Sequence, residues 1–416
     1  MKTNALRLYG KSDVRIESFE LPPIKEDELL VKIVCDSLCM SSWKAAIKAE
    51  DHKRVPDDIA TNPTVLGHEF CGEIVEVGEK WQGKYVPGQR FVVQPGMKET
   101  YDAIGYSFRN MGGDMTYGII PSIVVNGGYL IPYDGEAFFA GALGEPLSCV
   151  AGAVNANYHT THGDYEHIMG IKTGGKAAAL AAAGPMGLVL IDYLIHRDEK
   201  PSLLVCTDID AERLARAERV LPPAEAKKHG VELVYVNTSG TENPAGALRE
   251  LSGGEGYDDV FVFAPVSALV EQGDAMLAYD GCLNFFAGPE KEDFSAPFNF
   301  YNVHYNATHI AGTSGGNTDD MIESLALAAA GRIDPAILVT HVGGLDSAAE
   351  ATLNMPEIGG GKKVIYTHIS MPLTAIADFA KLGENDPFFA KLAELTDARG
   401  GLWNTEAERW LLEKGA

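Results

Sequence analysis

A strand, a glycine turn and a helix follow one another over residues 176–196, and this order restricts the fold more than any other feature. Lys176–Ala183 is an apolar run, Gly184-Pro185-Met186-Gly187 ends it, and apolar residues recur with helical spacing over Leu188–His196. A second apolar run follows at 202–208. Strands that alternate with helices at this spacing indicate a parallel sheet covered on both faces. We therefore expect an α/β chain.

The first part of the chain has a different pattern. Short alternating segments separated by Pro and Gly fill residues 6–144. This pattern is typical of a barrel-like or sandwich β domain. After an amphipathic helix expected at 318–330, the tail from 372 to 416 is predicted to be helical, and its sequence indicates no function.

The charge balance limits the classes of partner. The formal net charge is −24 and the sequence pI is about 4.8, which argues against nucleic acid or an anionic membrane as partner because both would be repelled. A small anionic substrate remains compatible with this charge. The sequence shows no transmembrane run and no signal peptide. Six scattered cysteines fit reduced thiols, and we therefore expect a cytoplasmic protein.

The turn after Ala183 has the features of a dinucleotide phosphate site. Ala182 stands at the first position of a G-x-G-x-x-G pattern, and Gly184 and Gly187 occupy the other two. Gly184 would let the backbone approach a pyrophosphate, and Gly187 would let the helix pack on the strand. With Pro185 and Met186 between them, these residues are the expected coenzyme-binding turn.

Two further residues bear on the choice of coenzyme. Asp208 ends the next predicted strand, where an acid would accept hydrogen bonds from the ribose hydroxyls and repel a 2′-phosphate. This favours NAD. Arg213, close by in the sequence, is either a helix-surface residue or a cation that tolerates a 2′-phosphate, so NADP stays possible.

Adjacent residues His68 and Glu69 are potential metal ligands. They lie between an apolar segment and an alternating one, and alone they would be more typical of a solvated turn. Two neighbouring ligands cannot complete a zinc site, so others must come from elsewhere in the chain. Cys39 and Glu145 are the candidates.

These features together resemble the zinc-containing medium-chain dehydrogenase/reductase family over about residues 4–369. Cys39, His68-Glu69 and Glu145-Pro146 match its metal-binding segments, and the last of them is similar to its polyol dehydrogenase branch. The resemblance implies a β-rich GroES-like catalytic domain and a Rossmann coenzyme domain with a doubly wound parallel sheet. The implied boundaries are 1–151 for the first part of the catalytic domain, 152–317 for the coenzyme domain, and 318–416 for the return to the catalytic domain and a helical extension.

The resemblance also implies one catalytic zinc ion. Cys39 would provide a thiolate, His68 an imidazole, and either Glu69 or Glu145 a carboxylate, with the other carboxylate held behind the ligands or bound through water. The family usually has a second, structural zinc held by four cysteines. No cysteine occurs between Cys71 and Cys149, so we expect no structural zinc and a lobe held by packing.

The proton path differs from the family pattern. Ser41 retains a hydroxyl that can take a proton from a substrate alcohol, whereas Ser42 replaces the usual aspartate and Lys44 the usual histidine. The catalytic candidates are therefore Ser41, Lys44 and Glu69.

The chain is similar to the L-sorbose-1-phosphate reductases of this branch. This similarity implies hydride transfer between NAD(P)H and a ketose phosphate, such as L-sorbose 1-phosphate, to give an alditol phosphate such as glucitol 6-phosphate. Alternatives are a dehydrogenase of an unphosphorylated polyol or secondary alcohol, and a non-catalytic dinucleotide-binding redox sensor. The family resemblance suggests a homodimer or homotetramer. Candidate phosphate-binding cations are Lys44, Lys48, His52, Lys53 and Arg54.

Overall fold

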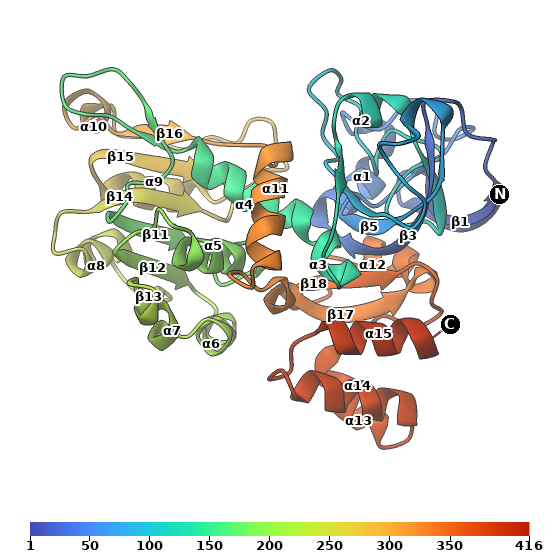
Figure 1. The fold of residues 1–416 in the computed structure, drawn as a ribbon. Coiled ribbons are helices and arrows are strands. Elements are labelled where there is room, and N and C mark those ends of the chain that lie inside the picture. The colour runs from blue at the N-terminus through green and yellow to red at the C-terminus, as the bar shows by residue number, and fades with distance from the viewer. Residues whose placement is uncertain (416) are drawn as a thin grey trace. The chain divides into compact units, whose positions relative to one another are not determined.

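The computed structural model describes residues 1–415, which divide into two compact units (Figure 1). Ala416, the last residue of the expected C-terminal extension, lies outside the described residues. Of the described residues, the first unit contains 1–145, 317–329 and 335–415, and the second contains 146–316 and 330–334. Among the described helices, none is long and apolar enough to cross a membrane.

An eight-stranded sheet forms the centre of the first unit. Its strand order is β19-β17-β18-β3-β5-β6-β8, and β7 pairs with β3. Nearly every residue of β3 is buried, as expected of a central strand. The bounds are β3 Leu29–Leu38, β5 Phe70–Val77, β6 Arg90–Val93, β7 Tyr117–Ile120, β8 Leu130–Pro132, β17 Val339–Gly344, β18 Lys362–Tyr366 and β19 Thr374–Ala375.

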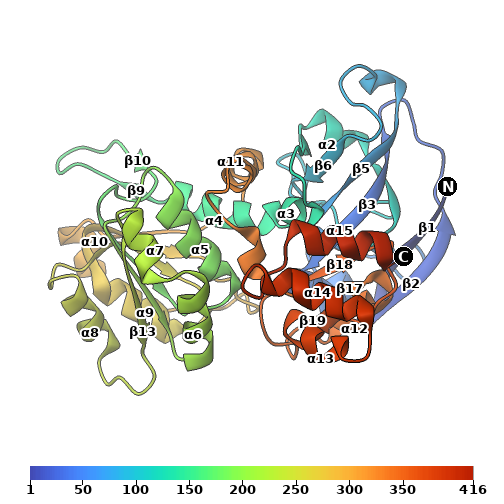
Figure 2. The same cartoon turned by 60° about the horizontal axis from the view of Figure 1, so that its bottom comes forward.

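A smaller sheet and several helices complete this unit. The sheet has the order β2-β1-β4, with β1 Lys2–Gly10, β2 Asp13–Glu20 and β4 Thr64–Val65. Helices α13, α14 and α15 form the C-terminal extension (Figure 2). The helix bounds are α1 Met40–Lys48, α2 Ser122–Asn126, α3 Phe138–Ala142, α11 Thr318–Ala329, α12 Ala348–Leu353, α13 Phe379–Gly383, α14 Pro387–Asp397 and α15 Thr405–Lys414, and α4 (Gly144–Ala156) continues into the second unit.

The register of β3 brings distant residues together. Strand β3 pairs antiparallel with β5, so that Asp36 lies opposite Phe70, and antiparallel with β18, so that Leu38 lies opposite Lys363. The end of β3 therefore has two neighbouring segments. One is the chain just before the start of β5, and the other is the start of β18. This edge of the sheet carries the candidate metal ligands.

The second unit is built on a parallel sheet of six strands in the order β13-β12-β11-β14-β15-β16 (Figure 1). Strands β12 and β14 are buried along their whole length because helices cover both faces (Figure 2). The bounds are β11 Lys176–Leu180, β12 Leu203–Asp208, β13 Glu232–Asn237, β14 Tyr257–Val262, β15 Leu277–Phe285, β16 His309–Ala311, α5 Pro185–His196, α6 Ala211–Val220, α7 Pro223–Lys228, α8 Pro244–Leu251, α9 Ser267–Met276 and α10 Phe300–Tyr305, with a hairpin of β9 Tyr158–His159 and β10 Ile168–Met169.

Strand β11 is shorter than the apolar run suggests. It ends at Leu180, whereas the run continues to Ala183. Ala181 has a φ of 55°, in the left-handed region that L residues avoid. The chain therefore leaves the sheet before the glycine turn, and only part of the apolar run is strand.

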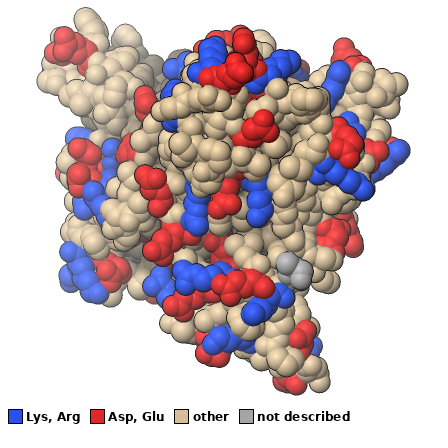
Figure 3. Space-filling model, turned by 45° about the vertical axis from the view of Figure 1, so that its right-hand side comes forward, with Lys and Arg blue, Asp and Glu red and all other residues tan. Residues whose placement is uncertain are grey.

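Acidic and basic side chains are interspersed on the face drawn in Figure 3. The chain has 58 acidic and 34 basic residues. Cations can still gather locally despite this net negative charge. One such group lies in the first unit.

Candidate metal and coenzyme sites

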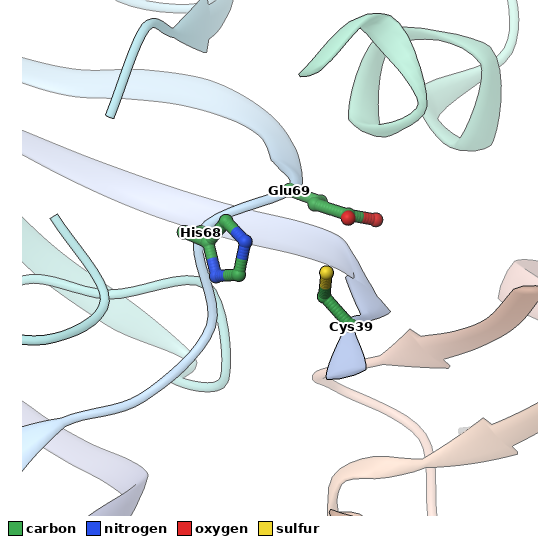
Figure 4. Close-up of side chains that lie close together, drawn as sticks. All are labelled: Cys39, His68 and Glu69. Atoms are coloured by element: carbon green, nitrogen blue, oxygen red, sulfur yellow. The ribbon is translucent and has the colours of Figure 1, made fainter. Parts of the chain in front are cut away.

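Cys39, His68 and Glu69 form a compact group at the end of β3. One ligand atom from each residue, sulfur, imidazole nitrogen or carboxylate oxygen, lies within 4.8 Å of the other two. The three side chains are directed toward a common space (Figure 4). His68 and Glu69 are buried, and Cys39 is half-buried. Thiolate, imidazole and carboxylate are the ligand types of catalytic zinc sites, so these donors fit the metal implied by the sequence.

Hydroxyl groups surround this trio. The Oγ of Ser41 lies 3.0 Å from the Cys39 sulfur and 3.1 Å from Nε2 of His68. The Oγ of Ser42 lies 3.3 Å from Nδ1 of the same ring, and the Tyr106 hydroxyl lies 3.4 Å from Nε2. The expected proton carrier is therefore in contact with two of the three donors. Ser42 supports the imidazole through a neutral hydroxyl.

Burial sets the protonation states in this group. It raises the pKa of Cys39 to about 12, an effect that nearby Lys362 opposes and that Glu69 and Glu145 reinforce. Burial also lowers the pKa of His68 to about 4. The imidazole is therefore neutral near pH 7, as metal ligation requires, whereas the thiol must lose its proton to a bound cation.

Glu69 forms a buried ion pair with Lys362. The Nζ of Lys362 lies 2.5 and 2.6 Å from the two carboxylate oxygens, and neither side chain exposes more than 9% of its surface. The peptide N–H of Glu69 donates to the Asp36 carboxylate at 3.1 Å. Two interactions thus hold Glu69 in place. Its carboxylate lies beside the Cys39 thiol, and the charge of Lys362 balances the charge of this carboxylate.

Glu145 lies nearby but outside the compact group. It is in the first turn of α4, and its negative charge raises the pKa values of Cys39 and Lys362. The described residues that meet the 4.8 Å limit are Cys39, His68 and Glu69. Among the described residues, Glu69 is thus the carboxylate that groups with both the thiol and the imidazole.

A group of cations adjoins the trio through Tyr106. The His52 ring stacks on Tyr106 with centroids 5.5 Å apart and an interplanar angle of 8°, and the Arg54 guanidinium carbon lies 5.8 Å from the same ring. Burial first, and then the charges of four cations, lowers the pKa of His52 to about 4. These cations are Arg54, Lys48, Lys53 and Lys44. Lys44, a catalytic candidate, thus contributes to the same positive field.

The glycine turn of the second unit fits a dinucleotide phosphate. Gly184 precedes α5, Pro185 is the first residue of that helix, and Met186 is half-buried beside it. A Cβ at Gly184 would meet no atom within 4 Å, so the backbone there is open to a ligand. A Cβ at Gly187 would lie 1.9 Å from the Ala182 carbonyl oxygen, so only glycine allows this close packing.

Asp208 ends β12 beside this turn. One carboxylate oxygen accepts the peptide N–H groups of Ile209 and Asp210 at 2.8 and 3.1 Å, and the other accepts that of Ala183 at 3.2 Å. The carboxylate therefore joins the ends of two neighbouring strands. Arg213 is 64% exposed, and its Nε lies 3.5 Å from Asp210.

Sequence reasoning missed two residues that surround the candidate metal ligands. Lys362 opens a strand together with Lys363, and paired lysines before an apolar segment suggest a solvated strand end, yet both are buried. Tyr106 carries no local signal in the sequence. Both reach the site only through the tertiary fold.

The lobe in which the family usually holds a structural zinc is packed. Met97, Ala103, Ile104 and Met111 are buried in it. Apolar packing therefore occupies the place that four thiolates would stabilise.

Two family models match the chain. Residues 25–130 match the alcohol dehydrogenase GroES-like domain, and residues 185–330 match the zinc-binding dehydrogenase model. The chain is 51% identical to mannitol-1-phosphate 5-dehydrogenase of Aliivibrio fischeri over 99% of this chain and 98% of that protein. It is 48% identical to L-sorbose 1-phosphate reductase of Klebsiella pneumoniae over 99% of this chain and 97% of that protein.

Solved structures agree on the fold. The chain matches 2R,3R-butanediol dehydrogenase from Bacillus subtilis with a TM-score of 0.72 and 23% identity, over 88% of this chain and 100% of that one. The expected α/β fold, with a GroES-like part and a Rossmann-type parallel sheet, is thereby confirmed. The chain belongs to the zinc-containing medium-chain dehydrogenase/reductase family, in its polyol dehydrogenase branch, and is an oxidoreductase of the NAD(P)-dependent alcohol and polyol dehydrogenase type.

Proposed function

We propose that the chain interconverts a ketose phosphate and an alditol phosphate, with one zinc ion and a nicotinamide coenzyme. The observation that carries this proposal is the position of a four-cation group next to the trio of Cys39, His68 and Glu69, linked through one tyrosine ring. A neutral polyol gives no reason for such a concentration of positive charge. Two relatives, mannitol-1-phosphate 5-dehydrogenase and L-sorbose 1-phosphate reductase, are named for sugar phosphates, which supports the same proposal.

Residues of the first unit have two roles in this proposal, metal binding and proton transfer. Cys39, His68 and Glu69 would hold the zinc ion, and Glu145 would serve as an additional carboxylate near them. When bound, zinc polarises the substrate oxygen. Ser41 lies within hydrogen-bond distance of two donors and takes up or returns the hydroxyl proton of the substrate.

The cation group holds the phosphate end of the substrate. Arg54 has a planar guanidinium suited to bidentate phosphate binding, and the lysines supply point charges. Because burial and these charges keep His52 neutral, its ring can donate or accept a hydrogen bond without adding to the positive charge of the group. This anchoring would orient the sugar with one hydroxyl or carbonyl toward the metal ligands.

The second unit binds the coenzyme. Gly184 and Gly187, with Pro185 and Met186, would form the phosphate-binding turn, and Asp208 would accept hydrogen bonds from the ribose hydroxyls, which favours NAD. The nicotinamide ring supplies or accepts the hydride. The Arg213 side chain is exposed and can turn toward a 2′-phosphate. We therefore propose NADP as the alternative coenzyme.

The test is a substrate panel on zinc-loaded protein. Turnover of L-sorbose 1-phosphate is compared with that of sorbose, and turnover of mannitol 1-phosphate with that of mannitol, each with both nicotinamide coenzymes. We expect kcat/KM at least about tenfold higher for the phosphorylated member of each pair, the gain from one or two charge-assisted contacts. A preference for the free sugar would replace this proposal with a polyol dehydrogenase.

A further inference from the structure

A carboxylate of the C-terminal extension lies buried inside the first unit. Glu408 of α15 exposes only 2% of its surface. Its Oε2 accepts the peptide N–H of Phe138 at 2.7 Å, and its Oε1 accepts the peptide N–H of Phe139 at 2.8 Å and the Tyr366 hydroxyl at 2.9 Å. That hydroxyl in turn accepts the indole N–H of Trp403 at 2.8 Å. The acid is therefore fully engaged by groups outside its own helix.

Two of these donors are the first peptide N–H groups of helix α3. The first N–H groups of any helix have no partner within the helix, and a side chain just before it usually accepts them. Ala137 holds that position here and provides no such side chain. Glu408 performs this role from 269 and 270 residues away along the chain.

Burial of this acid is unfavourable without these contacts. It raises the pKa of Glu408 to about 7, and the N–H and hydroxyl donors act in the opposite direction. A carboxylate that is buried where a helix packs against its neighbours costs free energy of folding. A leucine would fill the same space without that cost. Retention of a carboxylate there points to a role for its hydrogen bonds.

Helix α3 leads directly to a residue of the metal site. After α3 ends at Ala142, Leu143 joins it to α4, which begins at Gly144 and carries Glu145 in its first turn. Close packing also fixes α3 sideways, because a Cβ on Gly141 would lie 2.7 Å from the Cys71 sulfur of β5. The start of α3, held by Glu408, is therefore on the same short segment that carries Glu145.

We propose that Glu408 is a positioning residue, through which the C-terminal extension sets the place of Glu145 beside Cys39, His68 and Glu69. The proposal rests on the proposed metal site. It assigns a role to α15, whose sequence gives no indication of function. The carboxylate does not touch substrate or metal ligands, and it acts through the backbone of α3.

Metal affinity is the direct test. The full-length protein and Glu408→Gln are titrated with Zn²⁺ against a competing chelator, and the visible absorption of the Co²⁺-loaded proteins is recorded. Glutamine presents an NH₂ group to one of the two peptide N–H groups, so it loses an acceptor and repels a donor. We expect about tenfold weaker Zn²⁺ binding and an altered Co²⁺ spectrum.

Leu392→Ala is the matched control. Leu392 is fully buried in α14 of the same extension and contributes apolar packing alone. This variant is expected to lower thermal stability as much as Glu408→Gln or more, while Zn²⁺ affinity and the Co²⁺ spectrum stay those of the unmodified protein. Equal loss of affinity in both variants would overturn the proposal, since the effect would then follow from general loosening.

A double-mutant cycle tests whether the effect passes through Glu145. If it does, Glu408→Gln weakens Zn²⁺ binding in the unmodified protein but changes it less than about twofold in a Glu145→Ala background. A tenfold effect in both backgrounds would overturn the proposal. Should Glu408→Gln not fold, Glu408→Asp, which keeps the charge but shortens the reach, must weaken Zn²⁺ binding, and unchanged binding would overturn it. Absence of Zn²⁺ binding by the unmodified protein would instead refute the proposed metal site.

Discussion

Lys362 holds both carboxylate oxygens of Glu69, at 2.5 and 2.6 Å, inside the unit that carries the candidate metal ligands. Burial acts to lower the pKa of Lys362, but the attraction of Glu69 and Cys39 outweighs it, and the pKa is raised above its usual value. The lysine is therefore charged near neutral pH. It balances one carboxylate at a site that also contains a thiol.

Replacement of Lys362 by methionine is expected to destabilise the protein strongly. Removal of one partner leaves a buried charge without compensation, which costs about 3–5 kcal/mol. Chemical denaturation of the metal-free protein measures this loss. The double variant Glu69→Gln/Lys362→Met removes both charges and is expected to recover more than half of it. A loss below about 1 kcal/mol in the single variant would contradict the assignment of a tight buried pair.

Arg54→Gln is expected to separate phosphorylated from free substrates. Loss of one charge-assisted contact of about 1.5–3 kcal/mol corresponds to a rise in KM of about tenfold or more for a sugar phosphate. The KM for the free sugar should change less than about threefold. Steady-state kinetics with both substrates provide the comparison.

Arg109→Gln is the control for that experiment. Arg109 is 49% exposed and paired with Asp58 at 2.6 Å, so the variant changes the net charge equally without altering the group around Tyr106. We expect the same KM as in the unmodified protein. A similar rise in both variants would show that the protein's overall charge, and not Arg54 itself, attracts the phosphate.

Local sequence rules located most elements of the coenzyme unit. Helix α6 begins at Ala211, directly after Asp210, whose carboxylate accepts the N–H groups of Glu212 and Arg213 and so caps the helix. The strand expected at 202–208 begins one residue later, at Leu203. Propensity and capping act over a few residues, so sequence alone reveals them.

The three candidate metal ligands were within reach of sequence reasoning because each lies next to a strand end. Cys39 follows β3, and His68-Glu69 precede β5, so the pairing of two neighbouring strands suffices to bring them together. Lys362 lies 293 residues from Glu69 in the sequence. A partner that distant depends on the register of β18 against β3, which no local pattern specifies.

The C-terminal extension shows the same limit. Its helical character was predictable, and Leu392 of α14 and Leu411 of α15 are buried as amphipathic spacing suggests. Glu408 is equally buried. An acid in such a helix indicates a solvated face, and only the position of α3 shows why this one points inward.

Asp208→Asn is expected to change coenzyme selectivity. Asparagine keeps an oxygen for the N–H groups of Ile209 and Asp210 but removes the charge that disfavours a 2′-phosphate. The ratio of kcat/KM for NADH to that for NADPH should fall about tenfold. Arg213→Gln should move the ratio the other way, toward NADH. An unchanged ratio in Asp208→Asn would mean that this acid serves only to join the strand ends.

His341 provides a test of how burial couples stability to pH. Burial first, and then the charge of Lys363, lowers its pKa to about 4, while Asp378 acts in the opposite direction. The unfolded chain has the usual histidine pKa near 6.5 and so binds the proton more readily. The stability due to the neutral imidazole is therefore complete above pH 6.5 and is lost as pH falls toward 4.

We expect His341→Gln to reduce the loss of stability between pH 8 and pH 5 by about 1 kcal/mol, a value that allows for the partial exposure of the ring. Denaturant titrations at both pH values measure the difference, and contributions from other titrating groups cancel between the two proteins. His304→Gln, in the exposed part of α10, serves as the control and should leave the difference unchanged. If His341→Gln loses as much stability on acidification as the unmodified protein, solvent reaches this imidazole in the folded state and its burial does not govern its proton binding.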